Sequence, residues 1–172
     1  MIMKRKPNLK EAIKEKGFTQ MEFGEEVGYD QSTISKWING TRPVGKEAKP
    51  ILARGIDSFK YYVATFRETT GINLVPFMDG KRVKRDVASL RMLVEKERRE
   101  AMEFWDKDFW HVPAEFANET EREEARRFVK EYAEKIAAEY NLLAAFCDQY
   151  GFSLKEVDQQ MELSFKSRGL VQ

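Results

Sequence analysis

The sequence of 172 residues predicts an all-α protein built from five short helices, a hairpin of two long helices and one more helix at the carboxyl end. Hydrophobic residues recur at spacings of three and four along most of the chain, which is the period of an amphipathic helix. Hairpin signals are scarce, because the Asp79-Gly80 pair has no alternating runs beside it. Hydrophobic residues make up 42% and charged residues 34%, enough for a core under a charged surface.

The first two helices have clear boundary signals. We expect the first over Leu9–Lys16, ending at Gly17, which can adopt the left-handed conformation that stops a helix. Thr19 and Glu22 have the spacing of a capping box, so they predict the start of the second helix. That helix is expected to end at Gly28.

Three further short helices follow. Asp30 is positioned to cap the first of them, and Gly71 to stop the last. Pro50 must either kink the second or lie in its first turn, because proline lacks an N–H and fixes φ. The first two are expected over Gln31–Ile38 and Lys46–Arg54. The third is expected to begin at Asp57 or Ser58 and to end at about Thr70.

The carboxyl half contains longer periodic segments. Apolar residues alternate at spacings of four and three from Val83 to Phe104, and Glu97 interrupts the pattern. A capping box at Thr120 and Glu123 predicts the start of a helix of roughly thirty residues, interrupted by Glu139 and ending at Gly151. Ser153 with Glu156 predicts the start of the last helix. The two interrupting glutamates are expected to face solvent by default, or else to set the register or pair with arginines.

These segments predict a domain over residues 1–72, a basic linker over 73–85 and a helical self-association domain over 86–172. Three interpretations of the apolar stripes stay open: an intramolecular core, pairing with a second copy, or docking of another protein. We favour a homodimer or higher homo-oligomer. The expected self-association residues are Val87, Leu90, Val94, Val129, Tyr132, Ile136, Leu143 and Phe146.

The net charge of +1 hides an uneven distribution. Residues 1–60 hold 12 basic and 8 acidic side chains, a balance of +4, and residues 61–100 hold 9 and 6, a balance of +3. Residues 101–172 hold 9 and 15, a balance of −6. The amino end is therefore suited to nucleic acid and the acidic end to a protein partner.

Several classes of protein are disfavoured by what the sequence lacks. Cys147 and His111 are the only residues of their types, so we expect no disulfide, metal site, cofactor or enzymatic activity. Neither a phosphate-binding loop motif nor a dinucleotide-binding glycine motif occurs. The sequence has no apolar run of about 20 residues and no leader pattern, so a cytoplasmic protein without membrane contact is expected.

Residues from Thr19 to Gly40 have the pattern of two short helices that cross closely. Gly24 is small where the helices meet, and Gly28 tolerates a positive φ in the turn. Thr19-Gln20, the two glycines, Gln31–Trp37 and Asn39-Gly40 resemble the helix-turn-helix of the Xre, Cro and phage-repressor family. The resemblance covers about residues 5–70. Gly24 stands where this family usually has alanine, and Asp30 where a serine or threonine cap is common.

The resemblance implies that the second helix lies in the major groove of double-stranded DNA. Carried over by position, the base-contacting residues are Gln31, Ser32, Thr33 and Lys36, whose side chains suit base edges. The phosphate-contacting residues are Gln20, Asn39, Thr41 and Arg42, joined by Lys4, Arg5 and Lys6 if the amino-terminal segment is a DNA-binding arm rather than a solvated tail.

A second basic cluster, Lys81–Arg85, sits where a helix could start. Cations there oppose the helix dipole, so either the helix begins nearer Asp86 or an external anion such as phosphate binds the cluster.

Together these features predict a sequence-specific transcriptional regulator, a repressor of phage or bacterial type that binds a palindromic operator as a dimer. The alternative is an antitoxin or anti-repressor-like module whose acidic carboxyl half binds a partner protein.

Overall fold

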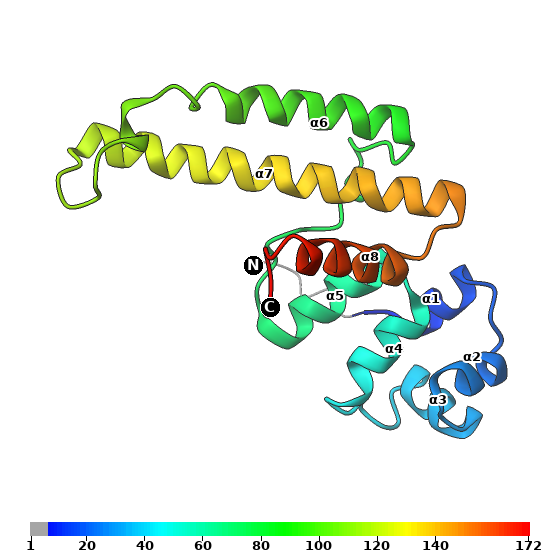
Figure 1. The fold of residues 1–172 in the computed structure, drawn as a ribbon. Helices are drawn as coiled ribbons and strands as arrows, with labels where there is room; N and C mark the ends of the chain where they lie inside the picture. Colours follow the sequence, from blue (N-terminus) through cyan, green and yellow to red (C-terminus); the bar gives the residue numbers. More distant parts are fainter. Residues whose placement is uncertain (1–6) are drawn as a thin grey trace. The chain divides into compact units, whose positions relative to one another are not determined.

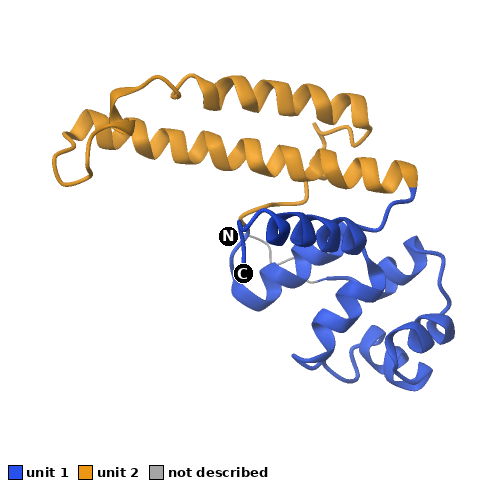
Figure 2. Ribbon diagram, viewed as in Figure 1, with its two compact units in different colours: residues 1–73, 151–172 blue, residues 74–150 orange. Residues whose placement is uncertain are grey.

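The computed structural model describes residues 7–172, which are all-helical as predicted and contain no strand. The chain divides into two compact units (Figures 1 and 2). Unit 1 comprises Met1–Asn73 and Gly151–Gln172, and unit 2 comprises Leu74–Tyr150. No helix within residues 7–172 combines the length and apolar character required to span a bilayer.

Over residues 7–73 and 151–172, unit 1 contains six helices: α1 (Leu9–Glu15), α2 (Gln20–Val27), α3 (Gln31–Ile38), α4 (Ala48–Ile56), α5 (Phe59–Thr70) and α8 (Leu154–Ser167). Its core is made by side chains from the first five of them. Phe23, Ile34 and Leu52 are fully buried there, so α2, α3 and α4 share one apolar centre. Burial of side chains of this size is the main stabilising contribution to such a small unit.

The predicted boundaries of α1, α2, α3 and α5 agree with the structure to within a residue or so. The fourth helix lies two residues later than expected, and Pro50 occupies its first turn, where the missing N–H costs no hydrogen bond. Ion pairs connect the helices at the surface. Lys60 on α5 reaches Glu11 and Glu15 on α1 at 2.6 and 3.0 Å.

The last helix, α8, groups with unit 1, whereas the sequence placed it in the carboxyl-terminal domain. Asp57 explains the attachment. It ends α4 in the left-handed conformation, with φ of 44°, and its carboxylate accepts hydrogen bonds from the Tyr62 hydroxyl and the Lys155 amide at 3.0 and 3.1 Å. Burial, together with the Asp57 charge, raises the pKa of Tyr62, so the phenol stays a donor.

Unit 2 is a hairpin of α6 (Val87–Met102) and α7 (Glu119–Tyr150), joined through a short 3-10 helix, η1 (Asp108–Trp110). The predicted capping box at Thr120 and Glu123 is wrong, because both residues lie inside α7. Asn118 and Glu121 form the reciprocal hydrogen bonds instead, at 2.8 and 3.0 Å. Asparagine caps a helix as well as threonine does, and the observed box lies two residues before the predicted one.

Small side chains, not large ones, form the buried face of α7. The buried residues of this helix are Ala137, Ala138, Asn141, Ala144, Ala145 and Cys147. Leu90 and Ala101 of α6 and Phe104 just after it are also buried. Small residues let two helices approach closely, and Leu90 is the large apolar side chain of α6 that is fully buried in this unit.

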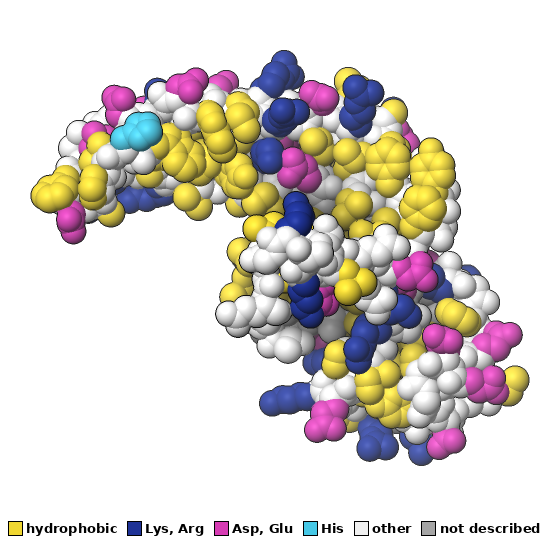
Figure 3. Space-filling model, in the orientation of Figure 1, with side chains coloured by type: hydrophobic (Ala, Val, Ile, Leu, Met, Phe, Trp, Pro, Cys, Tyr) yellow, Lys and Arg dark blue, Asp and Glu magenta, His cyan; other side chains and the backbone are white. Residues whose placement is uncertain are grey.

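The predicted self-association residues therefore divide into two groups. Leu90 is fully buried within unit 2, and Val87, Val94, Tyr132 and Ile136 are partly buried. In contrast, Val129, Leu143 and Phe146 keep 65%, 41% and 40% of their surface exposed. Figure 3 shows hydrophobic side chains gathered on the visible face of unit 2 between charged groups.

Aromatic side chains fill the end of the hairpin near η1. Trp110 lies 4.8 Å from Phe128 on α7 and 5.2 Å from Phe109, measured between ring centroids. Its indole N–H donates to the Phe104 carbonyl at 2.8 Å. Tyr132 extends this cluster at 5.2 Å from Phe128, so its ring is used inside the unit.

Asn141 is the fully buried polar side chain of unit 2, and it ties the segment before α6 to α7. Its carbonyl oxygen accepts from the Met78 amide and the Arg85 guanidinium at 2.9 and 3.0 Å. Its amide group donates to the Pro76 and Ala137 carbonyls at 2.9 and 2.8 Å. Every hydrogen-bonding group of this amide side chain is thus used.

The Asn141→Ala substitution should lower the free energy of unfolding by about 2–3 kcal/mol, because it leaves a buried amide and a guanidinium without their acceptor. Chemical denaturation followed by circular dichroism would measure the change. Gln149→Ala, at an exposed site on the same helix, is the control and should change stability by less than about 0.5 kcal/mol. Equal stability of the two variants would show that the four hydrogen bonds contribute nothing net.

Candidate nucleic-acid interface

The turn between α2 and α3 is fixed by two glycines. Gly28 ends α2 with φ of 73°, a conformation that other residues adopt only with strain. Gly24 faces the turn closely enough that a Cβ atom there would lie 2.5 Å from the Tyr29 carbonyl oxygen. The Tyr29 amide in turn donates to the Gly24 carbonyl at 2.8 Å. The close crossing predicted from these positions is therefore confirmed.

The start of α2 has the predicted capping box. Thr19 accepts from the Glu22 amide at 3.2 Å, and the Glu22 carboxylate accepts from the Thr19 amide at 2.8 Å. This hydrogen bond from the Thr19 backbone lowers the pKa of Glu22. Phe18 and Phe23 lie 6.0 Å apart between ring centroids, across the entry to the helix. The box and this aromatic contact set the direction in which α2 enters the fold.

One face of α3 is held in the core and the other is free. Ile34 is fully buried, and the ring of Trp37 packs edge to face against that of Tyr29, with 4.9 Å between the ring centroids. Gln31, Ser32 and Lys36 are exposed, and Thr33 is partly buried. Ser32 and Lys36 lie opposite Ile34 on the helix, whereas Gln31 is exposed as the first residue of α3. The four predicted base-contacting residues thus come from one eight-residue helix whose other side is fixed by packing.

Asp30 occupies the N-cap position of α3, but its side chain makes no capping hydrogen bond. The expected helix start at Asp30 is therefore confirmed, whereas the side-chain hydrogen bond of a cap is absent. Its extended backbone, with φ of −60° and ψ of 145°, already sets the helix start through the Asp30 carbonyl, which accepts from the Ile34 amide at 3.1 Å. The exposed carboxylate adds a negative charge beside the outer face of α3.

The predicted phosphate-contacting residues occupy two places in unit 1. Asn39, Thr41 and Arg42 are exposed and follow α3 directly, whereas Gln20 is the partly buried first residue of α2. The Thr41 hydroxyl donates to the Lys36 carbonyl at 3.1 Å, so its hydrogen is already used within the fold. Arg42 is the cation of this group. The predicted arm residues Lys4, Arg5 and Lys6 lie outside the described residues.

The basic cluster of unit 2 precedes the helix and does not begin it. Helix α6 starts at Val87, with Asp86 as its N-cap accepting from the Ser89 amide at 2.8 Å. Of the two alternatives for the cluster, the later helix start is therefore the one observed. Arg85 points inward, where its guanidinium lies 3.8 Å from the centroid of the Phe77 ring. Burial lowers the pKa of Arg85, and nearby Asp148 and Asp79 oppose that shift.

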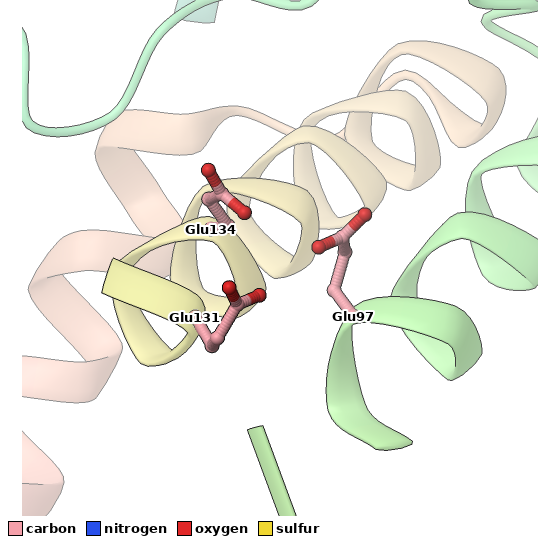
Figure 4. Close-up of side chains that lie close together, drawn as sticks. All are labelled: Glu97, Glu131 and Glu134. Carbon is pink, nitrogen blue, oxygen red and sulfur yellow. The ribbon is translucent and has the colours of Figure 1, made fainter. Parts of the chain in front are cut away.

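Three carboxylates meet between α6 and α7 (Figure 4). Oxygen atoms of Glu97, Glu131 and Glu134 lie within 4.8 Å of one another. Glu97 is buried, against the expectation that it faces solvent. Lys96 pairs with Glu97 at 3.1 Å, and Lys130 pairs with Glu131 and Glu134 at 3.0 and 3.2 Å. Carboxylate oxygens are ligands for hard cations, but two ammonium groups already offset two of these three negative charges.

The other interrupting glutamate is also paired. Glu139 of α7 is partly buried and lies 3.0 Å from Lys135, one turn earlier. Each of the two glutamates thus pairs with a lysine of its own helix. The sequence instead suggested exposure to solvent, a role in register or pairing with arginines. Exposed pairs contribute little to stability, and for the buried Glu97 the pairing lowers the cost of burying an unpaired charge.

Comparison with known proteins confirms the resemblance seen in unit 1. Residues 9–50 match a helix-turn-helix family model, a stretch that contains α1, α2, α3 and the start of α4. The match supports a DNA-binding regulatory helix-turn-helix in this part of the chain. No curated protein and no solved structure matches the chain.

Replacement of Gly24 by alanine should destabilise unit 1, although alanine favours a helix by roughly 1 kcal/mol over glycine. The new methyl group would overlap the Tyr29 carbonyl oxygen, a backbone atom that moves only if the turn opens. We expect a net loss of about 1–3 kcal/mol, measured by thermal or chemical unfolding. Glu25→Ala, at the exposed neighbouring position, is the control. A stabilised Gly24→Ala variant would contradict the close approach.

Proposed function

We propose that the protein is a sequence-specific DNA-binding transcriptional regulator, a repressor of phage or bacterial type that occupies a palindromic operator as a dimer. The observation that carries the proposal is the outer face of α3. Ser32 and Lys36 are exposed there, and Gln31 at the start of the helix, while Ile34 anchors the same helix in the core. A helix of this size fits the major groove of B-form DNA, where polar side chains distinguish base pairs.

The chemistry of the α3 side chains suits base readout. A glutamine amide matches the N6 and N7 atoms of adenine, and a lysine ammonium matches O6 and N7 of guanine. Thr33 adds a methyl group for contact with thymine. Asn39 and Arg42 follow the helix on exposed backbone and supply phosphate contacts that set its register. Gln20 contributes at the start of α2, a second helix end that supplies donors to the phosphates.

Selection of bound duplexes from a random pool tests the function directly. We expect an inverted repeat whose half-site centres are about 10 bp apart, or a multiple of the helical turn. Weak binding with no sequence preference and a steep salt dependence would reduce the helix-turn-helix to a non-specific tether.

The Gln31→Ala variant should lose about 1–3 kcal/mol of binding free energy on the selected sequence and almost none on random duplex. Arg42→Ala should weaken both kinds of duplex alike and lower the slope of log K against log salt by about 1. Fluorescence anisotropy titrations at several salt concentrations measure both quantities. If Gln31→Ala lost the same binding free energy on both duplexes, Gln31 would not take part in base readout.

The dimer in this proposal is supported by the large-residue stripe of α7. Val129, Ile136, Leu143 and Tyr150 recur every seven residues, and Phe146 lies on the same side. Helix α6 has 16 residues and packs on the small-residue face, whereas α7 has 32, so the stripe keeps substantial exposed apolar surface. A second copy presents an identical stripe, which makes a two-fold symmetric pairing self-complementary.

Charged substitutions in this stripe should separate the subunits. The double variant Leu143→Glu, Phe146→Glu is expected to be monomeric by light scattering, where the parent chain is dimeric, and to bind a two-half-site operator about 100-fold more weakly. Met92→Glu, at a highly exposed site on α6, is the matched control and should remain dimeric. A monomeric parent chain would overturn the dimer. A second protein copurifying with the parent chain, and lost from the variant, would instead support the partner-binding alternative.

A further inference from the structure

The basic loop of unit 2, defined here as residues 81–85, has a division of roles among its cations. Arg85 turns inward and is held by Asn141 and Phe77. Lys81, Arg82 and Lys84 are exposed. Across residues 7–172, no ion pair within 4.0 Å is found for these three side chains. One cation of the cluster is thus structural and three are free to meet an anion.

The loop is fixed at both ends. Before it, the Met78 amide donates to Asn141 and the Met78 carbonyl accepts from Arg85, at 2.9 and 3.1 Å. Within it, the Val83 amide donates to the Gly80 carbonyl at 2.9 Å, which closes a turn. After it, Asp86 caps α6. Binding of an anion to such a loop orders side chains only, because the backbone is already positioned.

Two acids flank the loop, Asp79 and Asp86, and Asp79 interacts electrostatically with the inward-facing Arg85. The neighbouring carboxylate, Asp86, accepts from the Ser89 amide, and this hydrogen bond is the main cause of its lowered pKa, with Lys84 a minor one. The loop also precedes the amino terminus of α6, whose partial positive charge adds to theirs. Positive charge gathered there attracts an anion.

We propose that Lys81, Arg82 and Lys84 form a second phosphate-binding site of the protein, which contacts the backbone of the duplex that α3 reads. The inference rests on the proposed function. Duplex DNA is the occupant that the chain itself favours, because the loop is joined covalently to the helix-turn-helix unit. Once α3 is bound, contact of a tethered cation cluster with the same duplex becomes an intramolecular event. Such contacts add affinity without sequence preference.

Salt dependence of binding tests the site on the full chain. Each phosphate contact contributes about 0.9 to the slope of log K against log salt, so the triple variant Lys81→Ala, Arg82→Ala, Lys84→Ala should lower that slope by about 2–3. Its affinity for a random-sequence duplex at about 0.1 M salt should fall about tenfold or more. The matched control is Arg91→Ala, Arg98→Ala, Arg99→Ala, which removes the same charge from exposed positions of α6. This control should leave the slope within about 1 of the parent value.

Two further readouts separate the outcomes. Hydroxyl-radical footprinting on the selected operator should show backbone positions that the parent chain and the control variant protect from cleavage and the loop variant does not. Thermal unfolding checks that both triple variants are folded. If the alanine variants are not folded, glutamine replacements at the same positions are used in their place. Loop and control variants with equal slopes and footprints would overturn the inference while the Arg42→Ala effect still upheld DNA binding. A parent chain that binds no duplex, with no effect of Arg42→Ala, would instead overturn the proposed function.

Discussion

The close approach of α2 and α3 is the constraint on which the interface depends. Gly24 lets the Tyr29 carbonyl come within the space a Cβ atom would fill, and Gly28 supplies the left-handed turn. With that turn in place, Ile34 and Trp37 pack against the core and the opposite face of α3 is left to solvent. Eight residues form too short a helix to be stable alone, so its exposed polar row exists only because the packed face is anchored.

The packing of unit 2 is determined by which face of α7 is buried. Alanines at 137, 138, 144 and 145 allow α6 to approach, and Asn141 fills the gap among them with a side chain whose four hydrogen bonds are directed at specific partners. An apolar residue there would pack as well but would leave the Met78 amide unpaired. The asparagine thus holds the segment before α6 against α7, and the large-residue stripe is left partly uncovered.

Local signals predicted most of the helices, since caps and glycine stops act over a few residues: Thr19 with Glu22, Gly28 and Gly71 all behave as expected. The buried face of α7 was not predictable in the same way, because hydrophobic periodicity weights large side chains and the helix packs through small ones. Asp57 gave no sequence signal for the attachment of α8, which depends on contacts 98 residues apart. At the interface, the exposed positions of α3 followed from the motif, whereas the absent side-chain bond of Asp30 required the structure.

The charge on and around α3 indicates how affinity and specificity are divided. The exposed outer face of α3 carries one cation, Lys36, and Asp30 at its start adds an opposing charge. A helix with so little net charge gains little from the phosphates, whose attraction supplies most non-specific affinity. Its contribution is therefore discrimination between bases, through neutral groups such as the Gln31 amide. The electrostatic attraction has to come from cations outside the helix, so in the proposed mechanism Arg42 and the basic loop hold the duplex while α3 reads it.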